Sequence, residues 1–75
     1  MKRFFGMMPS KEVEMEKEYV DKNNSKILIQ AGKNGWTVIY ADNSTSYKDV
    51  EGETLDNFNE AYNVAIKNLG NIKEV

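Results

Sequence analysis

The chain has 75 residues and a formal net charge of −2, and it contains neither cysteine nor histidine. We expect a single domain over 1–75 with a small core. Without cysteine there are no disulfides or thiolate metal sites, and without histidine the commonest general base and metal ligand is missing, so we expect no enzyme, no metal and no cofactor.

The first ten residues, "MKRFFGMMPS", form an N-terminal segment (1–10) in which two basic residues are followed by an apolar run. A secretory signal needs roughly 7–15 consecutive apolar residues, whereas this run is interrupted at Gly6 and ends at Pro9. No other stretch approaches the ~20 apolar residues of a membrane span, so we expect a cytoplasmic protein without a membrane partner. We expect the segment to pack against folded protein, its own or a neighbour's, through Phe4, Phe5, Met7 and Met8.

A strand is predicted near 12–20, because Val13, Met15 and Tyr19 alternate with a row of four glutamates. A helix over 11–20 remains the alternative, since Glu and Lys favour helices, although it would stack like charges four residues apart. The glutamate row suggests either a cation-binding patch or a solvated strand face. We favour the solvated face, because a straight strand does not converge ligands on an ion.

Two strands near 26–31 and 36–41 are predicted to form a hairpin at Asn34-Gly35, the strongest short hairpin signal. A type I′ turn at that pair would place Lys33 opposite Trp36. This register gathers the apolar residues of both strands on one face, namely Ile27, Ile29, Ala31, Trp36, Val38 and Tyr40.

A fourth strand is predicted near 45–50, after a turn of two or four residues. Either loop places Tyr47 beside Trp36 and Tyr40, an aromatic cluster that we interpret as core rather than as a stacking platform. The opposite face then carries Leu28, Gln30, Thr37, Ile39, Ser46, Lys48 and Val50.

A helix is predicted over 54–69, with Thr54 as N-cap and Gly70 as its stop. Its apolar stripe is expected to cover the Ile29/Val38 face of the sheet, and the tail 71–75 is expected to be loose. The fold class is therefore α+β, a four-stranded antiparallel meander packed on one C-terminal helix. The stripe consists of Leu55, Phe58, Tyr62, Ala65, Ile66 and Leu69.

This arrangement leaves the second sheet face without a cover, and uncovered apolar residues often mark interaction sites. We therefore expect a protein-interaction module whose partner is another protein or a second copy of the chain. The candidate surface combines the N-terminal segment with the open sheet face: Phe4, Phe5, Met7, Met8, Leu28, Gln30, Thr37, Ile39, Lys48 and Val50.

The stretches "FFGMMPS", "IQAGKNGWTVIYADNST" and "YKDV" resemble small uncharacterised proteins encoded on conjugative transposons of Gram-positive bacteria. That resemblance implies an accessory role on a mobile element and no site residues. Residues 27–69, with "GWTVIYAD" and "NFNEAYNVA", are also similar to the DNA-binding arm domain of tyrosine integrases. This second likeness implies a sheet that reads DNA through Gln30, Thr37, Ser46 and Lys48. The alternative function is thus a DNA-binding accessory domain, although the acidic balance disfavours nucleic acid.

Overall fold

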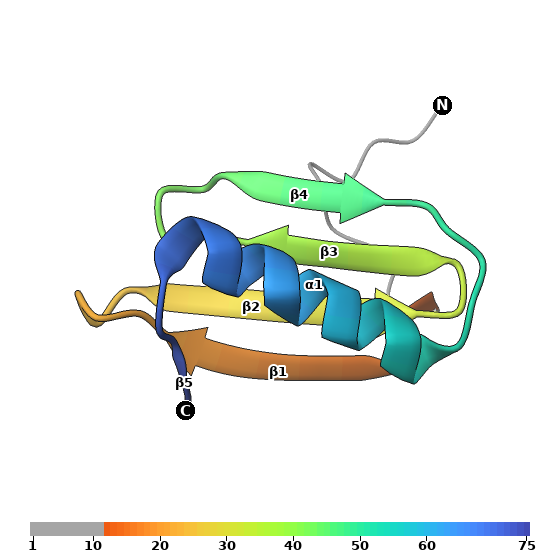
Figure 1. Cartoon of the computed structure of the whole chain (residues 1–75), viewed down its shortest axis with the longest axis horizontal. Helices are drawn as coiled ribbons and strands as arrows, with labels where there is room; N and C mark the ends of the chain where they lie inside the picture. Colours follow the sequence, from red (N-terminus) through yellow and green to blue (C-terminus); the bar gives the residue numbers. More distant parts are fainter. Residues whose placement is uncertain (1–11) are drawn as a thin grey trace.

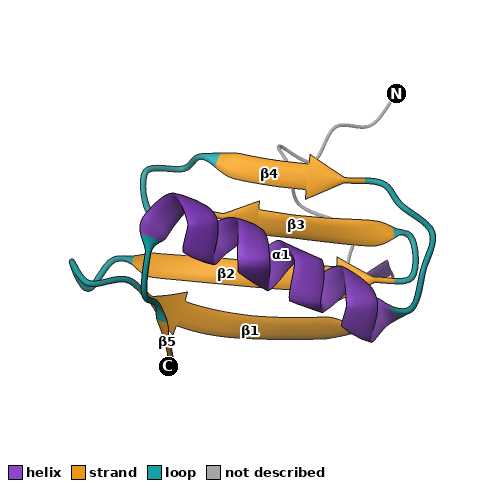
Figure 2. Cartoon of the chain, in the orientation of Figure 1, coloured by secondary structure: helices purple, strands orange, loops and turns teal. Residues whose placement is uncertain are grey.

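The computed structural model describes residues 12–75 and has the predicted α+β class (Figure 1). Its sheet is antiparallel, with strand order β4-β3-β2-β1-β5, and α1 lies across one face of it (Figure 2). The elements in chain order are β1 (Met15–Val20), β2 (Lys26–Gly32), β3 (Gly35–Ile39), β4 (Thr45–Lys48), α1 (Thr54–Leu69) and β5 (Lys73–Glu74).

β1 is a strand, as its alternating pattern indicates, and it pairs with β2 from Met15 to Val20. It begins three residues later than the predicted range 12–20. Just before it, the Glu14 N–H still donates to the Ala31 carbonyl oxygen at 2.9 Å. The helical alternative for 11–20 is therefore wrong within the described residues.

The first hairpin differs from its prediction in register. Its turn residues are Lys33 and Asn34, so Gly32 lies opposite Gly35 and Ala31 lies opposite Trp36. Gly35 has φ +147°, and a Cβ there would lie 2.0 Å from the Lys48 carbonyl oxygen. A glycine is thus required here, because the chain at the end of β4 passes close to it. The turn is not of type I′, because neither Lys33 nor Asn34 has positive φ. The shift moves each partner by two residues, so the predicted face is confirmed.

The second hairpin reverses the predicted side of β4. The Tyr40 N–H donates to the Ser44 carbonyl oxygen at 2.7 Å and encloses a three-residue loop, 41–43, in which Asn43 has φ 70°. An odd loop inverts the parity that two or four residues would give. Tyr47 consequently lies opposite Thr37, away from the predicted aromatic cluster, and Lys48 lies opposite Trp36.

The fifth strand corrects the expectation of a loose tail at 71–75. Gly70, with φ 82°, ends α1 as predicted, and the chain then returns to the free side of β1. Lys73 pairs with Val20 and Glu74 with Tyr19, and the Lys17 ammonium lies 3.9 Å from Glu74 Oε2. Two paired residues are too few for a periodicity signal in the sequence.

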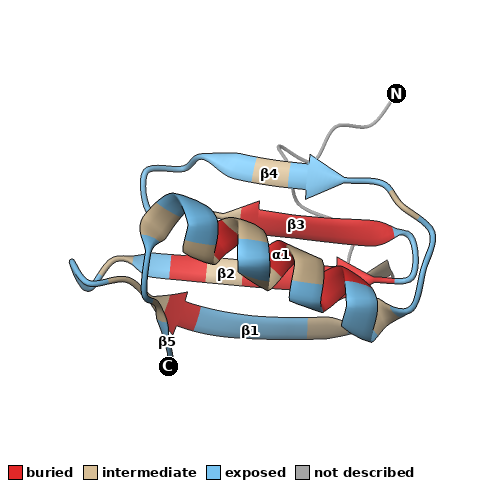
Figure 3. Ribbon diagram, viewed as in Figure 1, coloured by how far each residue is buried: buried red, intermediate tan, exposed pale blue. Residues whose placement is uncertain are grey.

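The core lies between α1 and the sheet (Figure 3). α1 turns Phe58, Ala61 and Ala65 to the sheet, and the two alanines allow a close approach. The predicted stripe is confirmed except at Leu55, which is 56% exposed, since Tyr62 and Leu69 also pack against the core. The buried apolar residues are Tyr19, Ile27, Ile29, Ala31, Trp36, Val38, Phe58, Ala61 and Ala65.

The start of α1 also differs in detail from its prediction. Glu53, not Thr54, occupies the N-cap position, and no side chain caps the helix there. The Thr54 hydroxyl instead donates to Glu14 Oε1 at 2.6 Å. Asn57, which lies outside the predicted apolar stripe, is 3% exposed, and its amide donates to the Gly32 carbonyl oxygen at 2.7 Å. This bond fixes the start of α1 against the first hairpin.

Candidate functional site: the sheet face opposite the helix

The sheet face that points away from α1, called the outer face below, carries two rows of side chains across four strands. Residues directly opposite one another in a sheet share a face, so the strand registers define both rows. The first row is Glu18, Leu28, Ile39 and Thr45, and the second is Glu16, Gln30, Thr37 and Tyr47.

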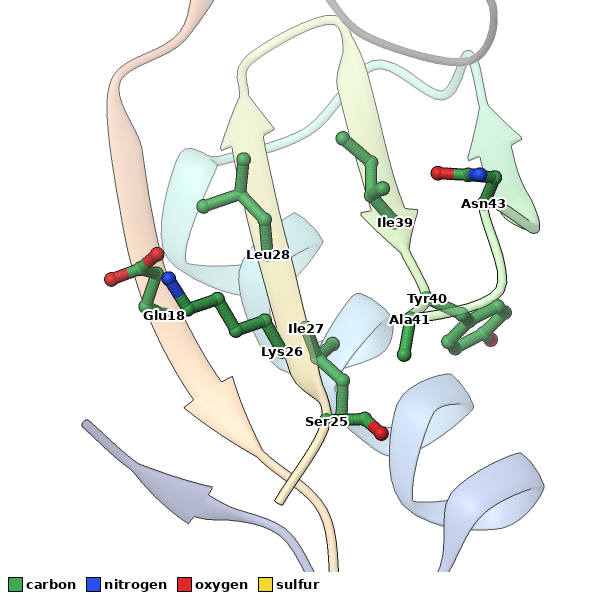
Figure 4. A pocket seen from close by; sticks show the side chains of 9 residues that line it. All are labelled: Glu18, Ser25, Lys26, Ile27, Leu28, Ile39, Tyr40, Ala41 and Asn43. Atoms are coloured by element: carbon green, nitrogen blue, oxygen red, sulfur yellow. The ribbon is translucent and has the colours of Figure 1, made fainter. Parts of the chain in front are cut away.

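The first row is apolar at its centre and charged at one end. Leu28 and Ile39 are cross-strand partners, both half-buried, and they line a depression of about 330 Å³ (Figure 4). At the β1 side of this depression, the Glu18 carboxylate and the Lys26 ammonium point toward one another, and Asn43 lies near its other side. The depression thus has an apolar floor with one acid and one base at its rim.

The second row is polar, and its two central residues are buried. Gln30 is 5% exposed and Thr37 is 0% exposed, although both side chains point away from the core. Gln30 Nε2 donates to Glu16 Oε1 at 3.1 Å, but Gln30 Oε1 and Thr37 Oγ1 have no hydrogen-bond partner among the described residues. Buried polar atoms are usually paired, so these two oxygens are exceptions, as is Trp36 Nε1 on the α1 side, which also has no partner among the described residues.

Tyr47 ends the second row, where the sequence prediction did not place it. Its side chain is 48% exposed. Partial burial, and then the nearby Asp49 and Glu12 carboxylates, raise the pKa of the phenol, so the hydroxyl remains a donor at neutral pH. Asn43, a residue type that tolerates positive φ, was the sequence signal that could have indicated the odd loop.

The structure brings together four of the predicted site residues, Leu28, Gln30, Thr37 and Ile39. It does not bring Lys48 to them, because β4 turns this side chain toward α1. There Nζ donates to Glu60 Oε2 at 2.6 Å and lowers the pKa of that carboxyl. Val50 follows β4, and its carbonyl oxygen accepts a 3.4 Å hydrogen bond from the Asn57 amide. Phe4, Phe5, Met7 and Met8 lie outside the described residues.

The residues proposed for DNA reading do not share one face. Gln30 and Thr37 are on the outer face, whereas Ser46 and Lys48 lie opposite Val38 and Trp36 on the α1 side. On the outer face, Gln30 is flanked by Glu16, to which its amide is bonded. In the described part of the chain, no three acidic side chains gather into a group that could hold a metal ion.

Comparison with known proteins finds no matching family model, no curated relative and no similar solved structure. Within residues 12–75, no helix has the length and apolar content needed to cross a membrane. The outer face thus combines a half-buried apolar pair, Leu28 and Ile39, with a polar row.

Proposed function

We propose that the protein is a non-enzymatic interaction module of the cytoplasm, and that its outer face binds a second copy of the chain. The observation that carries this proposal is the Leu28–Ile39 pair, which lines a depression on the sheet face opposite α1. An apolar centre with a polar rim is the usual composition of a protein interface. Phe4, Phe5, Met7 and Met8 join the contact region in this proposal.

Charge favours a second copy as the occupant. The rim of the depression carries both an acid, Glu18, and a base, Lys26. A two-fold interface places the same patch on both sides, so a patch with both signs offers each copy a complementary charge. The exposed Tyr47 adds an aromatic side chain of the kind enriched in interface centres.

The test is the molar mass of the full 75-residue chain, measured by sedimentation equilibrium from micromolar to millimolar concentration. We expect the mass to rise toward that of a dimer. The double variant Leu28→Glu, Ile39→Glu is expected to remain monomeric, because each interface would bury four uncompensated carboxylates.

The matched control is Asn63→Glu, Asn71→Glu, which adds the same charge at exposed positions away from the outer face. It is expected to associate like the unaltered chain. Far-ultraviolet circular dichroism of all three proteins confirms that they are folded. A monomer at every concentration, or equal association of both double variants, contradicts the proposal.

The accessory role on a conjugative transposon, implied by the resemblance described above, remains a prediction. Its test is the genomic neighbourhood of the coding sequence. Genes for conjugation or integration beside it support the role, and a neighbourhood without them in several genomes contradicts it.

A further inference from the structure

The outer side of β1 is paired over only part of its length. β5 pairs with Tyr19 and Val20, and the Val75 N–H donates to the Glu18 carbonyl oxygen at 2.9 Å. Backbone groups of alternate residues point to the same side of an antiparallel strand, so those of Glu16 point the same way as those of Glu18. Within residues 12–75, no strand pairs with Glu16 on that side. Among the described residues, this part of β1 therefore has a free edge beside β5.

A groove of about 340 Å³ lies between this part of β1 and α1. Tyr19 and Tyr62 pack together in it with ring centroids 5.4 Å apart and planes tilted by 49°. Leu55 borders it and is 56% exposed, one of the few large apolar side chains so exposed in the described chain. The apolar lining of the groove consists of Met15, Tyr19, Leu55, Phe58 and Tyr62.

We propose that this edge and groove bind an extended peptide of another protein, which adds to β1 as a further antiparallel strand. Its backbone would pair with the outward N–H and C=O of Glu16. The side chains opposite Met15 and Lys17 would enter the groove, because directly paired residues share a face. The site goes beyond the proposed function, since it involves neither Leu28 nor Ile39 and takes a different partner.

The charges on the outer side of β1 determine which side chains the peptide would carry on its other face. Its remaining side chains would lie on the outer face beside Glu16 and Glu18, both of which are exposed acids. Opposite charges across a strand pair are favourable and like charges are not. On the groove side, the Lys17 ammonium already lies 3.9 Å from Glu74 and 5.7 Å from the centre of the Phe58 ring. The partner is therefore a segment in which apolar residues alternate with lysine or arginine.

The experiment titrates the isotopically labelled 75-residue chain with a short blocked peptide of alternating lysine and valine, followed by nuclear magnetic resonance. We expect saturable shifts of the Glu16, Leu55 and Phe58 amides and slower hydrogen exchange at Glu16. A peptide of the same composition, with its lysines grouped at one end, is expected to bind about tenfold more weakly.

Two single variants separate the contributions of groove and charge. Leu55→Ala is expected to weaken peptide binding about fivefold. Glu16→Gln is expected to make the peptide affinity less dependent on salt concentration. Asn63→Ala, at an exposed position away from the groove, is the control and is expected to bind like the unaltered chain. Equal affinity for both peptides, shifts confined to Leu28 and Ile39, or no binding would overturn the proposal.

Discussion

Thr37 and Val38 are neighbours in β3, and both are 0% exposed, yet they belong to opposite faces of the sheet. Val38 packs in the core between β3 and α1. Thr37 lies in a polar row, and its hydroxyl has no hydrogen-bond partner among the described residues. Equal burial therefore does not imply an equal role. The α1 side of the sheet packs into the core, whereas the outer face carries polar residues beside its half-buried Leu28–Ile39 pair.

The largest expected effect comes from deleting core volume on the α1 side. Ile29→Ala should lower the free energy of unfolding by about 3 kcal/mol, because it leaves a cavity at a residue that is 0% exposed. Leu28→Ala, one residue earlier on the outer face, should cost less than about 1 kcal/mol. Urea unfolding followed by Trp36 fluorescence measures both. Equal losses at the two positions would contradict the division between the faces.

The second largest loss of stability is expected at Asn57, whose buried amide is hydrogen-bonded. Asn57→Ala removes the donor to the Gly32 carbonyl oxygen and should cost about 2 kcal/mol, since that oxygen is left buried without its partner. Asn63→Ala on the exposed side of α1 should change stability by less than about 0.5 kcal/mol. The same urea experiment applies, and a loss at Asn57 no greater than that at Asn63 would contradict this role.

The Thr37 hydroxyl on the outer face predicts a change of the opposite sign. Thr37→Val keeps the shape of the side chain and removes a buried polar atom that has no partner among the described residues. We expect the variant to gain up to about 1 kcal/mol of stability. Thermal unfolding at low protein concentration measures the gain. A loss above about 1 kcal/mol would mean that the hydroxyl is satisfied within the fold.

The smallest effect is expected at the exposed Lys48–Glu60 pair on the α1 side. The hydrogen bond from Lys48 lowers the pKa of Glu60, so the contribution of this pair is present above the unfolded-state pKa. It is lost as the pH falls through the folded-state pKa. Lys48→Gln should therefore differ slightly from the unaltered chain at neutral pH and not at all at low pH. A difference that persists in acid, or that is insensitive to salt, would contradict an ion-pair origin.

The sequence was sufficient to predict those features that depend on periodicity. α1 has the predicted bounds 54–69, and the Ile29/Val38 face is correct even though the hairpin register shifted. The helix follows from its apolar spacing and the stop at Gly70, and the sheet face follows from alternating apolar residues, which a shift of two residues does not disturb. The placement of Leu28 and Ile39 on one face follows in the same way, but their direct pairing does not, because the predicted register puts Ile39 opposite Gln30.

The features that were missed depend on contacts between distant residues. Gly35 lies outside the turn, opposite Gly32, where a Cβ would meet the backbone at Lys48. The single extra residue in loop 41–43 moved Tyr47 to the outer face and Lys48 away from it. β5 consists of two residues held by β1, and Asn57 is buried by a bond to Gly32. None of these contacts leaves a periodic pattern in the sequence.

The central claim, that the outer face is the contact surface with a second copy, is tested most directly by dilution. Amide resonances of the unaltered chain are recorded by nuclear magnetic resonance from millimolar to micromolar concentration. We predict that the signals of Leu28, Thr37 and Ile39 shift with concentration, while those of α1 do not. Concentration-dependent shifts centred on α1, or none anywhere in the chain, would contradict the account.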